Sequence, residues 1–276
     1  MNIIDIIKRR KSVRSFNGKP LSPEMADKLH EAIKDSDSPF GGNVTIRLKY
    51  FDLKAGYKPG TYGMIKGATN FFLLGYGSDE ESALVAGFRF EQVVLKACEM
   101  GLGTCWIAGT FKGQDFDRDE TWSEGENLRV VCPVGIPEKP RLFEKLGRMA
   151  IGSDRRKPFG ELFYADDFKQ SLSPDGHFGE SLEMMRLAPS STNSQPWRAL
   201  VKCDTVHFYY KPKSHLSTLD CGIGLCHFYL TEKYLGRKGE FYRQPDSLPV
   251  PPENWKYLYS YRRFCREDKG DVGQNL

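Results

Sequence analysis

The 276-residue sequence lacks the features of several large classes of protein. Its longest apolar runs, FFLLGY and LRVVCPVGI, are far shorter than the roughly 20 residues that span a bilayer, so no membrane helix is expected. In MNIIDIIKRRK the apolar part precedes the charges, which is the reverse of a secretory signal. These absences predict a cytoplasmic protein with no membrane partner.

Motifs of several enzyme classes are also missing. No GxGxxG follows a strand-like segment, so a tightly bound dinucleotide is not expected. Ser190 and Ser191 lie in no GxSxG motif, which disfavours hydrolase chemistry. None of the seven cysteines forms a CxxC pair, and Cys221, Cys226 and His227 are poorly spaced for zinc, so no metal site is predicted.

Charge and composition further limit the class of protein and its expected partners. A net charge of +4 is mild and diffuse, so nucleic acid is not an expected partner. With 39% hydrophobic residues the chain can bury a core. Five cysteines lie in apolar segments and are expected to be buried as small hydrophobes: Cys98, Cys105, Cys132, Cys203 and Cys226. Surface or core roles are expected for the five histidines, which form no catalytic group: His30, His177, His207, His215 and His227.

Several segments recur in the same order in the two parts of the chain. The matching pairs are LSPE (21–24) with LSPD (172–175), SPFGGN (38–43) with APSSTN (188–193), and LVAGFRFEQVVLKACEMG (84–101) with LDCGIGLCHFYLTEKYLG (219–236). Repeated segments in a constant order indicate a repeated structural unit. We therefore predict two related halves, residues 1–157 and residues 158–276.

Each half has the same predicted order of elements. A capped helix that starts at Ser22 and Pro23 comes first, and a polar turn, a strand, a long helix and a late strand follow. The predicted strands are 44–53, 128–136, 197–210 and 255–264. The long helices, 84–100 and 222–235, are apolar on all sides, so we expect them to be buried, packed against each other. This order predicts an α+β fold, in which two halves form an internal pseudo-dimer with central long helices and flanking sheets.

A basic cluster follows the first predicted helix. Arg10, Lys11, Ser12 and Arg14 place three cations and a hydroxyl within five residues. Planar guanidinium groups pair bidentately with phosphate oxygens, so the cluster suits a phosphate. The alternative is a local role, because cations near a helix C-terminus also offset the helix dipole.

The two halves differ in their polar residues. The basic cluster aligns with Glu161, Leu162, Phe163 and Ala165, which carry no positive charge. Conversely, the second half has a polar turn with Ser190, Ser191, Thr192, Asn193 and Gln195, where the first half has Phe40, Gly41, Gly42, Asn43 and Thr45. A symmetric pair has two equivalent interfacial sites. Here one site could combine the basic cluster with the polar turn, and the other would have neither.

The sequence resembles the FMN-dependent nitroreductase family in two signatures. RKSVRSF (10–16) is similar to the family's Arg-Arg-Ser-x-Arg-x-Phe, with Lys11 as the departure, and APSSTNSQPW (188–197) is similar to Ala-Pro-Ser-x-x-Asn-x-Gln-Pro-Trp. GLGTCWIAG (101–109), VGIPEKP (134–140) and RRKPFGELF (155–163) are also family-like. Typical members carry both signatures near the N-terminus. A chain in which each half supplies one resembles the single-chain, tandem-half members.

The resemblance implies a nitroreductase-like α+β fold. Ordinary members are homodimers that bind two FMN molecules at the subunit interface, so this chain would be a monomer with one FMN between its halves. Phosphate contacts would come from Arg10, Lys11, Ser12, Arg14, Arg155 and Arg156. Contacts with the flavin ring and ribityl chain would come from Pro189, Ser190, Ser191, Asn193 and Gln195, and from the backbone of Ile107, Ala108 and Gly109.

The resemblance also implies an oxidoreductase. Electrons would pass from NAD(P)H through FMN to a nitroaromatic, quinone or similar small acceptor in a ping-pong cycle. Because the flavin carries the chemistry, no catalytic side chain is expected. The alternative is a flavin- or heterocycle-binding sensor that does not turn over.

Overall fold

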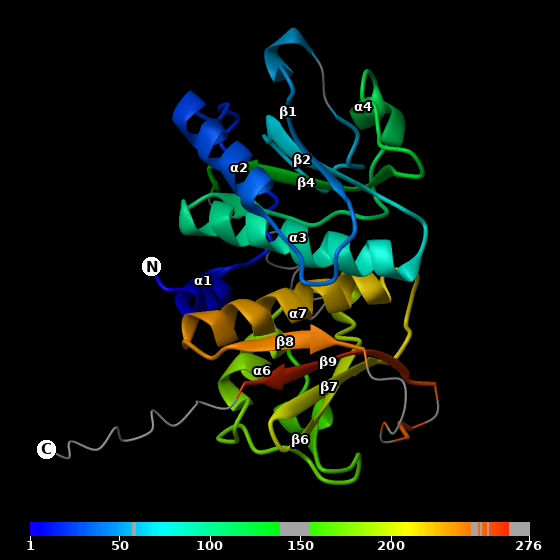
Figure 1. Ribbon diagram of the computed structural model, residues 1–276. Helices are drawn as coiled ribbons and strands as arrows, with labels where there is room; N and C mark the ends of the chain where they lie inside the picture. The colour runs from blue at the N-terminus through cyan, green and yellow to red at the C-terminus, as the bar shows by residue number, and fades with distance from the viewer. Residues whose placement is uncertain (57–58, 139–154, 244–247, 249, 253, 265–276) are drawn as a thin grey trace, which may run out of the picture.

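The computed structural model describes residues 1–56, 59–138, 155–243, 248, 250–252 and 254–264. Figure 1 shows two long helices across the middle of the molecule, with one β-sheet above them and another below. The central helices are α3 (Glu80–Glu99) and α7 (Ser217–Tyr234). Among the described residues no helix is long and apolar enough to cross a membrane.

The other elements follow the chain order. Those before residue 139 are α1 (Ile3–Arg9), α2 (Pro23–Asp35), β1 (Thr45–Tyr50), β2 (Asn70–Tyr76), β3 (Gly103–Thr104), α4 (Gly113–Asp117) and β4 (Asn127–Gly135). Those after residue 154 are β5 (Phe163–Ala165), α6 (Gly179–Arg186), β6 (Trp197–Lys202), β7 (Thr205–Tyr210), β8 (Gly239–Tyr242) and β9 (Lys256–Arg263). Short 3₁₀ turns lie at Leu53–Ala55, Phe159–Glu161 and Ser191–Asn193.

The two sheets have matching strand orders. The first sheet is β1-β2-β4-β3 and the second is β5-β6-β7-β9-β8. All neighbours are antiparallel except β5, which runs parallel to β6. Without β5, the second sheet repeats the first in order and direction. The α+β prediction is confirmed.

The central helices pack directly on each other at two glycines. A Cβ atom on Gly87 would lie 2.1 Å from the carbonyl oxygen of Leu219, and a Cβ on Gly222 would lie 2.1 Å from the carbonyl oxygen of Leu84. These are the positions that align in the sequence repeat. Only glycine permits such an approach of two backbones. The prediction that the long helices are buried together is confirmed.

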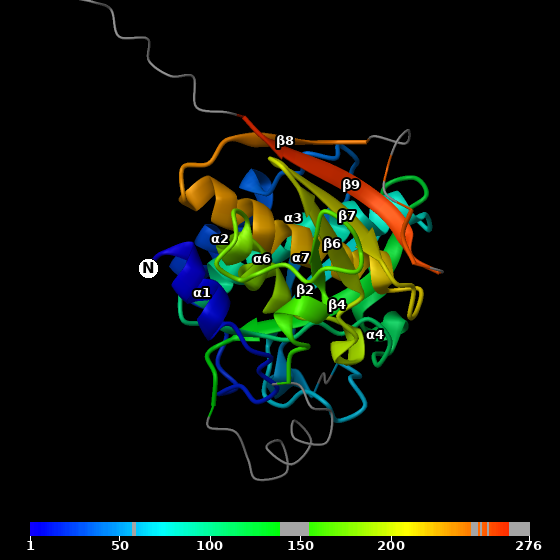
Figure 2. The ribbon, with the colours of Figure 1, turned by 90° about the horizontal axis from the view of Figure 1, so that it is seen from below.

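The N-terminal helix α1 lies on the second half of the molecule. Its Ile6 and Ile7 are buried in one core cluster with Met184 of α6 and Phe228 of α7. Figure 2 shows α1, α6 and the second sheet from below. The chain therefore leaves α1 at the boundary between the two halves, where the basic cluster begins.

Helix α2 starts where the sequence predicts. The hydroxyl of Ser22 accepts a hydrogen bond from the backbone N–H of Met25 at 3.3 Å, and Pro23 occupies the first helical position. In the second half the corresponding helix α6 begins only at Gly179, and its cap residue Phe178 makes no side-chain bond. The LSPD segment therefore does not cap a helix as LSPE does.

Three further expectations were wrong. Residues 197–210 form a hairpin rather than one strand, and Cys203 lies in its turn with a φ of 52°, exposed to solvent instead of buried. The alignment of Ser12 with Phe163 does not correspond in space. Ser12 pairs with Thr104 beside β3, whereas Phe163 pairs with Ala199 of β6, at the opposite sheet edge.

Candidate functional site

The basic cluster is fixed by its backbone along the edge of the first sheet. The N–H of Val13 donates to the carbonyl of Thr104 at 2.8 Å, and the carbonyl of Arg14 accepts from the N–H of Lys66 at 2.9 Å. Val13 fits against Gly103, where a Cβ would lie only 2.7 Å from the valine side chain. Because backbone hydrogen bonds and the packing of Val13 hold this segment, its basic side chains are not needed to hold the backbone in place.

Arg10 is a buried cation whose ion pair with Glu91 is long. Its side chain is 7% exposed, and its Nε has no hydrogen-bond partner in the described part of the chain. The nearest carboxylate oxygen, Oε1 of Glu91, lies 4.0 Å from Nε. A buried donor left unpaired is costly, and a buried charge more so. This environment would be stabilised by an anion.

Glu91 belongs to a buried network that joins the two halves. Its Oε2 accepts from Nε1 of Trp106 at 2.9 Å, and its Oε1 lies 2.9 Å from Nε2 of His227 on α7. The other ring nitrogen of His227 lies 3.1 Å from the carbonyl of Met184 and must donate, because a carbonyl only accepts. A further proton therefore sits between His227 and Glu91.

The position of that proton does not change the total charge. If it resides on His227, an imidazolium faces a carboxylate; if it resides on Glu91, both groups are neutral. In either case the group formed by Arg10, Glu91 and His227 carries one net positive charge, buried beside the interface between the central helices α3 and α7. The predicted core role of His227 is confirmed, and the cluster as a whole favours an anionic ligand.

The remaining residues of the basic cluster lie nearer the surface. Lys11 is exposed, and Ser12 and Arg14 are half-buried. The thiol of Cys105 donates to the backbone carbonyl of Trp106 at 3.8 Å. Burial raises the pKa of that thiol, and the charge of Arg14 offsets the rise only in part. Cys105 is therefore a neutral thiol beneath the segment rather than a reactive one.

The polar turn is held in an unusual backbone conformation. Thr192, Asn193 and Gln195 have φ values of 49°, 55° and 47°, a region that non-glycine residues rarely adopt. The Ser190 hydroxyl accepts from the N–H of Gln195 at 3.0 Å. The turn is followed by Trp197, which is fully buried as expected of an anchor. Strained residues that cluster in this way commonly mark functional sites.

The segment at 155–157 lines the same turn. The Asn193 amide donates to the carbonyl of Arg155 at 2.6 Å and accepts from Nη1 of Arg156 at 2.9 Å. The Gln195 amide oxygen accepts from the N–H of Lys157 at 2.8 Å. The structure therefore brings Arg155 and Arg156 together with Asn193 and Gln195. Pro189 is half-buried just before them.

Asp220 of α7 docks the turn from below. Its Oδ1 accepts from the N–H of Ser191 at 2.9 Å, and its Oδ2 accepts from the hydroxyl of Ser194 at 3.3 Å. Asp220 and His227 are seven residues apart on one helix, so they share a face about 10 Å apart along the axis. The polar turn therefore contacts α7 at Asp220, and the network of Arg10 and Glu91 contacts α7 at His227, roughly two helical turns away.

The family-like segment after β3 lies beside β4. Ile107 is buried and exchanges two backbone hydrogen bonds with Val131, at 3.0 and 2.9 Å. Ala108 is half-buried and Gly109 is exposed, and a Cβ on Gly109 would meet no atom within 4 Å. A side chain at Gly109 would therefore point into open space. Of the VGIPEKP segment, residues 139 and 140 lie outside the described residues.

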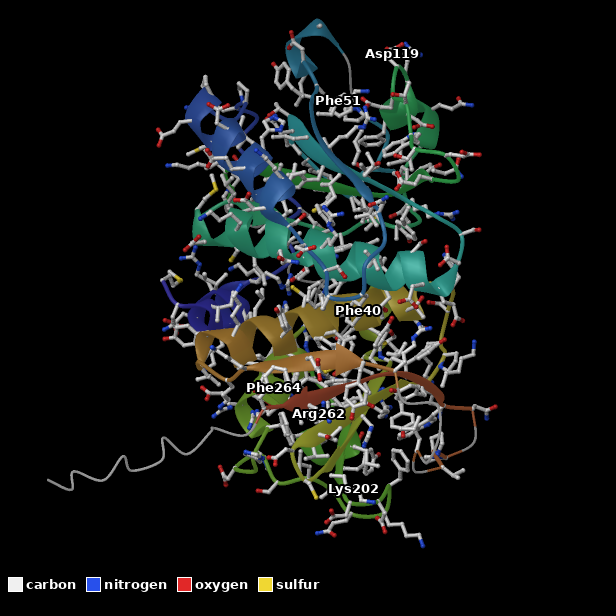
Figure 3. The ribbon with its side chains drawn as sticks, in the orientation of Figure 1. Phe40, Phe51, Asp119, Lys202, Arg262 and Phe264 are labelled. Carbon is white, nitrogen blue, oxygen red and sulfur yellow. The ribbon has the colours of Figure 1, made fainter. Side chains whose placement is uncertain are left out.

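The turn that contains Phe40 reaches from the first half of the chain onto the second. Phe40 packs on Phe241 and Tyr259 of the second sheet, with ring centroids 5.0 and 4.5 Å apart, and on Phe88 of α3 at 5.3 Å. In Figure 3 this turn passes in front of α3, and Phe40 lies at the interface between α3 and α7. An aromatic side chain therefore fills the position that aligns with Ser190.

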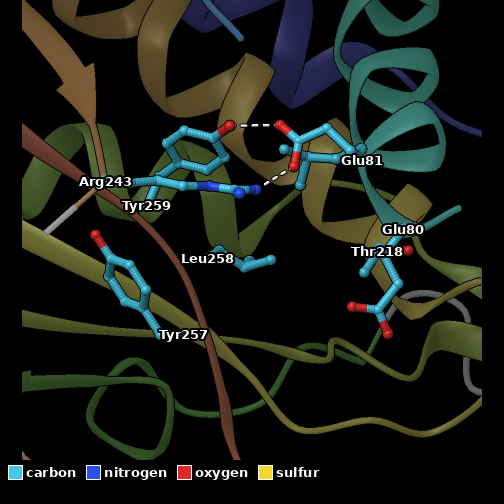
Figure 4. A pocket seen from close by; sticks show the side chains of 8 residues that line it. Glu80, Glu81, Thr218, Arg243, Tyr257, Leu258 and Tyr259 are labelled. Atoms are coloured by element: carbon cyan, nitrogen blue, oxygen red, sulfur yellow. Dashed lines mark hydrogen bonds and ion pairs between the residues drawn. The ribbon is translucent and has the colours of Figure 1, made fainter. Parts of the chain in front are cut away.

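A pocket lies beside Phe40, at the N-terminal ends of the central helices. Its lining residues are Glu80, Glu81, Leu84, Thr218, Arg243, Tyr257, Leu258 and Tyr259. Figure 4 shows that Glu81 accepts from both Arg243 and Tyr259. The guanidinium of Arg243 also lies over the ring of Tyr259, 4.7 Å from its centroid. These polar groups satisfy one another, in contrast to Arg10.

Burial raises the pKa of the Asp220 carboxyl to about 7, although the bonds from Ser191 and Ser194 oppose the rise. The folded protein then binds this proton more tightly than the unfolded chain, so Asp220 lowers stability as pH rises from about 4 to about 7. Compared with the wild type, Asp220→Asn should gain roughly 2–3 kcal/mol more at pH 8 than at pH 5. Urea unfolding at both pH values measures this gain, with Asp27→Asn on the exposed face of α2 as the control. Equal effects of Asp220→Asn at the two pH values would contradict the assignment.

The fold and these clusters correspond to a known class of protein. A crystal structure described as "a putative nitroreductase", from Thermotoga maritima, superposes with a TM-score of 0.62 at 19% identity, over 95% of this chain and 94% of that one. The α+β architecture is therefore the nitroreductase fold.

The family follows from the sequence itself. A family model described as "Putative TM nitroreductase" matches residues 2–232, so the chain belongs to this nitroreductase family and the predicted resemblance is confirmed. No curated protein matches the chain significantly.

Two further structures match about half of the chain. A "Putative NADH dehydrogenase/NAD(P)H nitroreductase" from Bacteroides thetaiotaomicron has a TM-score of 0.41 at 22% identity, over 50% of this chain and 88% of that one. An "FMN-dependent Nitroreductase" from Clostridium difficile has a TM-score of 0.40 at 16% identity, over 50% of this chain and 89% of that one.

Three residues of the site were missed in the sequence: Glu91, Trp106 and Asp220. The signal for two of them was present, because each carboxylate stands alone in an apolar helical stretch, FRFEQVV and LDCGIGL. A buried carboxylate needs a partner. For Glu91 the partner on α7 is set by the packing of the two halves, and for Asp220 the partners are set by the packing of the polar turn on α7; the sequence gives neither.

Proposed function

We propose that this protein is an FMN-dependent oxidoreductase of nitroreductase type, which passes electrons from NAD(P)H to a nitroaromatic, quinone or similar small acceptor. The observation that carries the proposal is Arg10, a buried guanidinium whose Nε has no hydrogen-bond partner among the described residues and whose ion pair with Glu91 is long, at 4.0 Å. It lies within the family-like signature RKSVRSF and within a cluster that has one positive charge in excess. A phosphate would satisfy both the donor and the charge.

The arrangement along α7 supports FMN in particular. FMN carries a phosphate and a flat ring, joined by a five-carbon ribityl chain. Arg10, Lys11, Ser12 and Arg14 would hold the phosphate. The turn at 189–195 would contact the ring and the ribityl chain, at an anchor roughly 10 Å away along the helix. Arg155 and Arg156, which the resemblance assigns to the phosphate, bind Asn193 in this structure, so we propose that they support the turn instead.

We propose that the site is composite, formed between the halves 1–157 and 158–276 of an internal pseudo-dimer. The reciprocal contacts of Gly87 and Gly222 and the repeated strand order support this arrangement. Phe40 reaches from the first half onto strands of the second. By the same geometry, the turn that carries Ser190 would reach onto the sheet of the first half. Because Phe40 and self-paired charges fill the other interface, one FMN per monomeric chain is expected.

Bound FMN would supply the hydride and electron transfer. The protein's own residues would bind and orient it. The cations at residues 10–14 would neutralise the phosphate, while the amides and hydroxyls of the polar turn would match donors and acceptors on the ring edge. Open backbone at Ala108 and Gly109 would leave room for the ring face, over which donor and acceptor would bind in turn in the ping-pong cycle.

Titration of the flavin-free protein with FMN tests this proposal. We expect saturation at one FMN per chain and a rise in melting temperature, because a ligand that binds only the native state stabilises it, by about 2.7 kcal/mol at 100 times its Kd. Anaerobic NADH or NADPH should then bleach the yellow protein. A colourless protein whose melting temperature ignores FMN would refute flavin binding. A yellow protein that only dithionite bleaches would support the sensor instead.

A further inference from the structure

Asp220 is a carboxylate in an otherwise apolar stretch of helix. Its side chain is buried at 3% exposure, between the buried residues Leu219 and Cys221. Both of its oxygens are used by one partner, the polar turn, through the N–H of Ser191 and the hydroxyl of Ser194. A buried carboxylate is costly to keep in a helix core. Its bonds to the turn compensate for part of that cost.

The first half makes the equivalent contact without a carboxylate. The position that aligns with Asp220 in the repeat is Val85 of α3. There the turn lies close by, since a Cβ on Gly42 would be 3.3 Å from Cγ2 of Val85. An apolar turn thus rests on a valine, whereas the polar turn rests on an aspartate. The carboxylate occurs on the side where the turn carries the family-like signature.

The backbone of the polar turn needs such a contact. Thr192, Asn193 and Gln195 all have positive φ, and this conformation persists only where neighbours enforce it. The segment at 155–157 binds Asn193 and Gln195 on one side. Asp220 binds the other side of the turn, through Ser191 and Ser194. Without Asp220, the near end of the turn loses two hydrogen bonds and its attachment to α7.

We propose that Asp220 is a positioning residue, which docks Ser191 and Ser194 on α7 and so holds residues 190–195 in the conformation that faces the flavin ring. Asp220 acts through the turn and does not touch the ligand itself. The flavin part of this inference rests on the proposed function, whereas the hold on the turn does not.

Amide hydrogen exchange of the flavin-free protein tests the hold on the turn. Asp220→Val, which copies the first half, should speed exchange at residues 190–195 at least about 10-fold, because the Ser191 amide loses its acceptor. Asp220→Asn keeps an acceptor at Oδ1 and should stay near the wild type. Thr231→Val, an isosteric change elsewhere on α7, is the matched control. Unchanged exchange at 190–195 in Asp220→Val, or equal acceleration along all of α7, would overturn the proposal.

Flavin affinity tests the functional part. Asp220→Val should weaken binding of FMN and of riboflavin about equally, roughly 10-fold, because the turn would contact the ring that both ligands share. Asp220→Asn should restore both affinities. Weakening of FMN alone would overturn the assigned role. If the wild type binds neither ligand, the proposed function fails, and the exchange experiment still decides whether Asp220 positions the turn.

Discussion

Replacement of Arg10 and Arg14 together by alanine should strip FMN from the protein without unfolding it. Each arginine would contribute a charge-assisted hydrogen bond to the phosphate, worth about 1.5–3 kcal/mol. Loss of both should weaken FMN binding by about 100-fold or more. The fold should persist, because the backbone of this segment is held by Thr104 and Lys66 rather than by the arginine side chains. Fluorescence titration with FMN gives the affinity.

Two controls make this result specific. Lys8→Ala removes an exposed cation from the neighbouring helix turn and should leave FMN affinity unchanged. Riboflavin lacks the phosphate, so its affinity should change far less than that of FMN in the double variant. Unchanged FMN affinity together with a lower melting temperature would mean that these arginines serve the dipole of α1 instead.

Alanine at Gly87 or at Gly222 should destabilise the protein more than most single substitutions. The added methyl group would lie 2.1 Å from a carbonyl oxygen of the facing helix, so α3 and α7 must separate. Separating the helices would remove packing contacts along the whole interface between α3 and α7. We therefore expect a loss of about 3 kcal/mol or more in the free energy of unfolding. The two variants should behave alike, since their contacts are reciprocal. Urea unfolding measures both.

Gly224→Ala is the matched control on the same helix. The atoms nearest to a Cβ at Gly224 are side-chain atoms of Met185 and Trp197, at 3.3 Å, and alanine gains up to about 1 kcal/mol in helix propensity. Its net effect should be small. If Gly224→Ala and Gly222→Ala destabilise equally, the backbone contact at the crossing is not what the glycines provide.

Local signals in the sequence predicted most of the elements. The Ser22–Pro23 start gave α2, and the all-round apolar pattern of 84–100 and 222–235 gave the buried helix pair. The hairpin at 197–210 was missed because its turn uses Cys203 at positive φ, where glycine or asparagine is the usual signal. Local chemistry therefore predicts an element well only when its turns use the usual residues.

The site was predictable only in part, for a different reason. The two signatures named the basic cluster and the polar turn, but not the residues beneath them. Glu91 meets His227, 136 positions away, only once the two halves pack, and Asp220 meets Ser191, 29 positions away, only once the polar turn packs on α7 within the second half. The alignment of Ser12 with Phe163 also failed, because similarity in order along the chain does not determine which sheet edge a segment joins.

A crystal structure of the protein with bound FMN tests the composite site most directly. We predict a single flavin per chain, with its phosphate within hydrogen-bonding distance of Arg10 and its ring between the turn at 190–195 and the backbone at 107–109. A flavin held entirely by one half of the chain, or bound in the pocket beside Glu81 and Tyr259, would contradict the account.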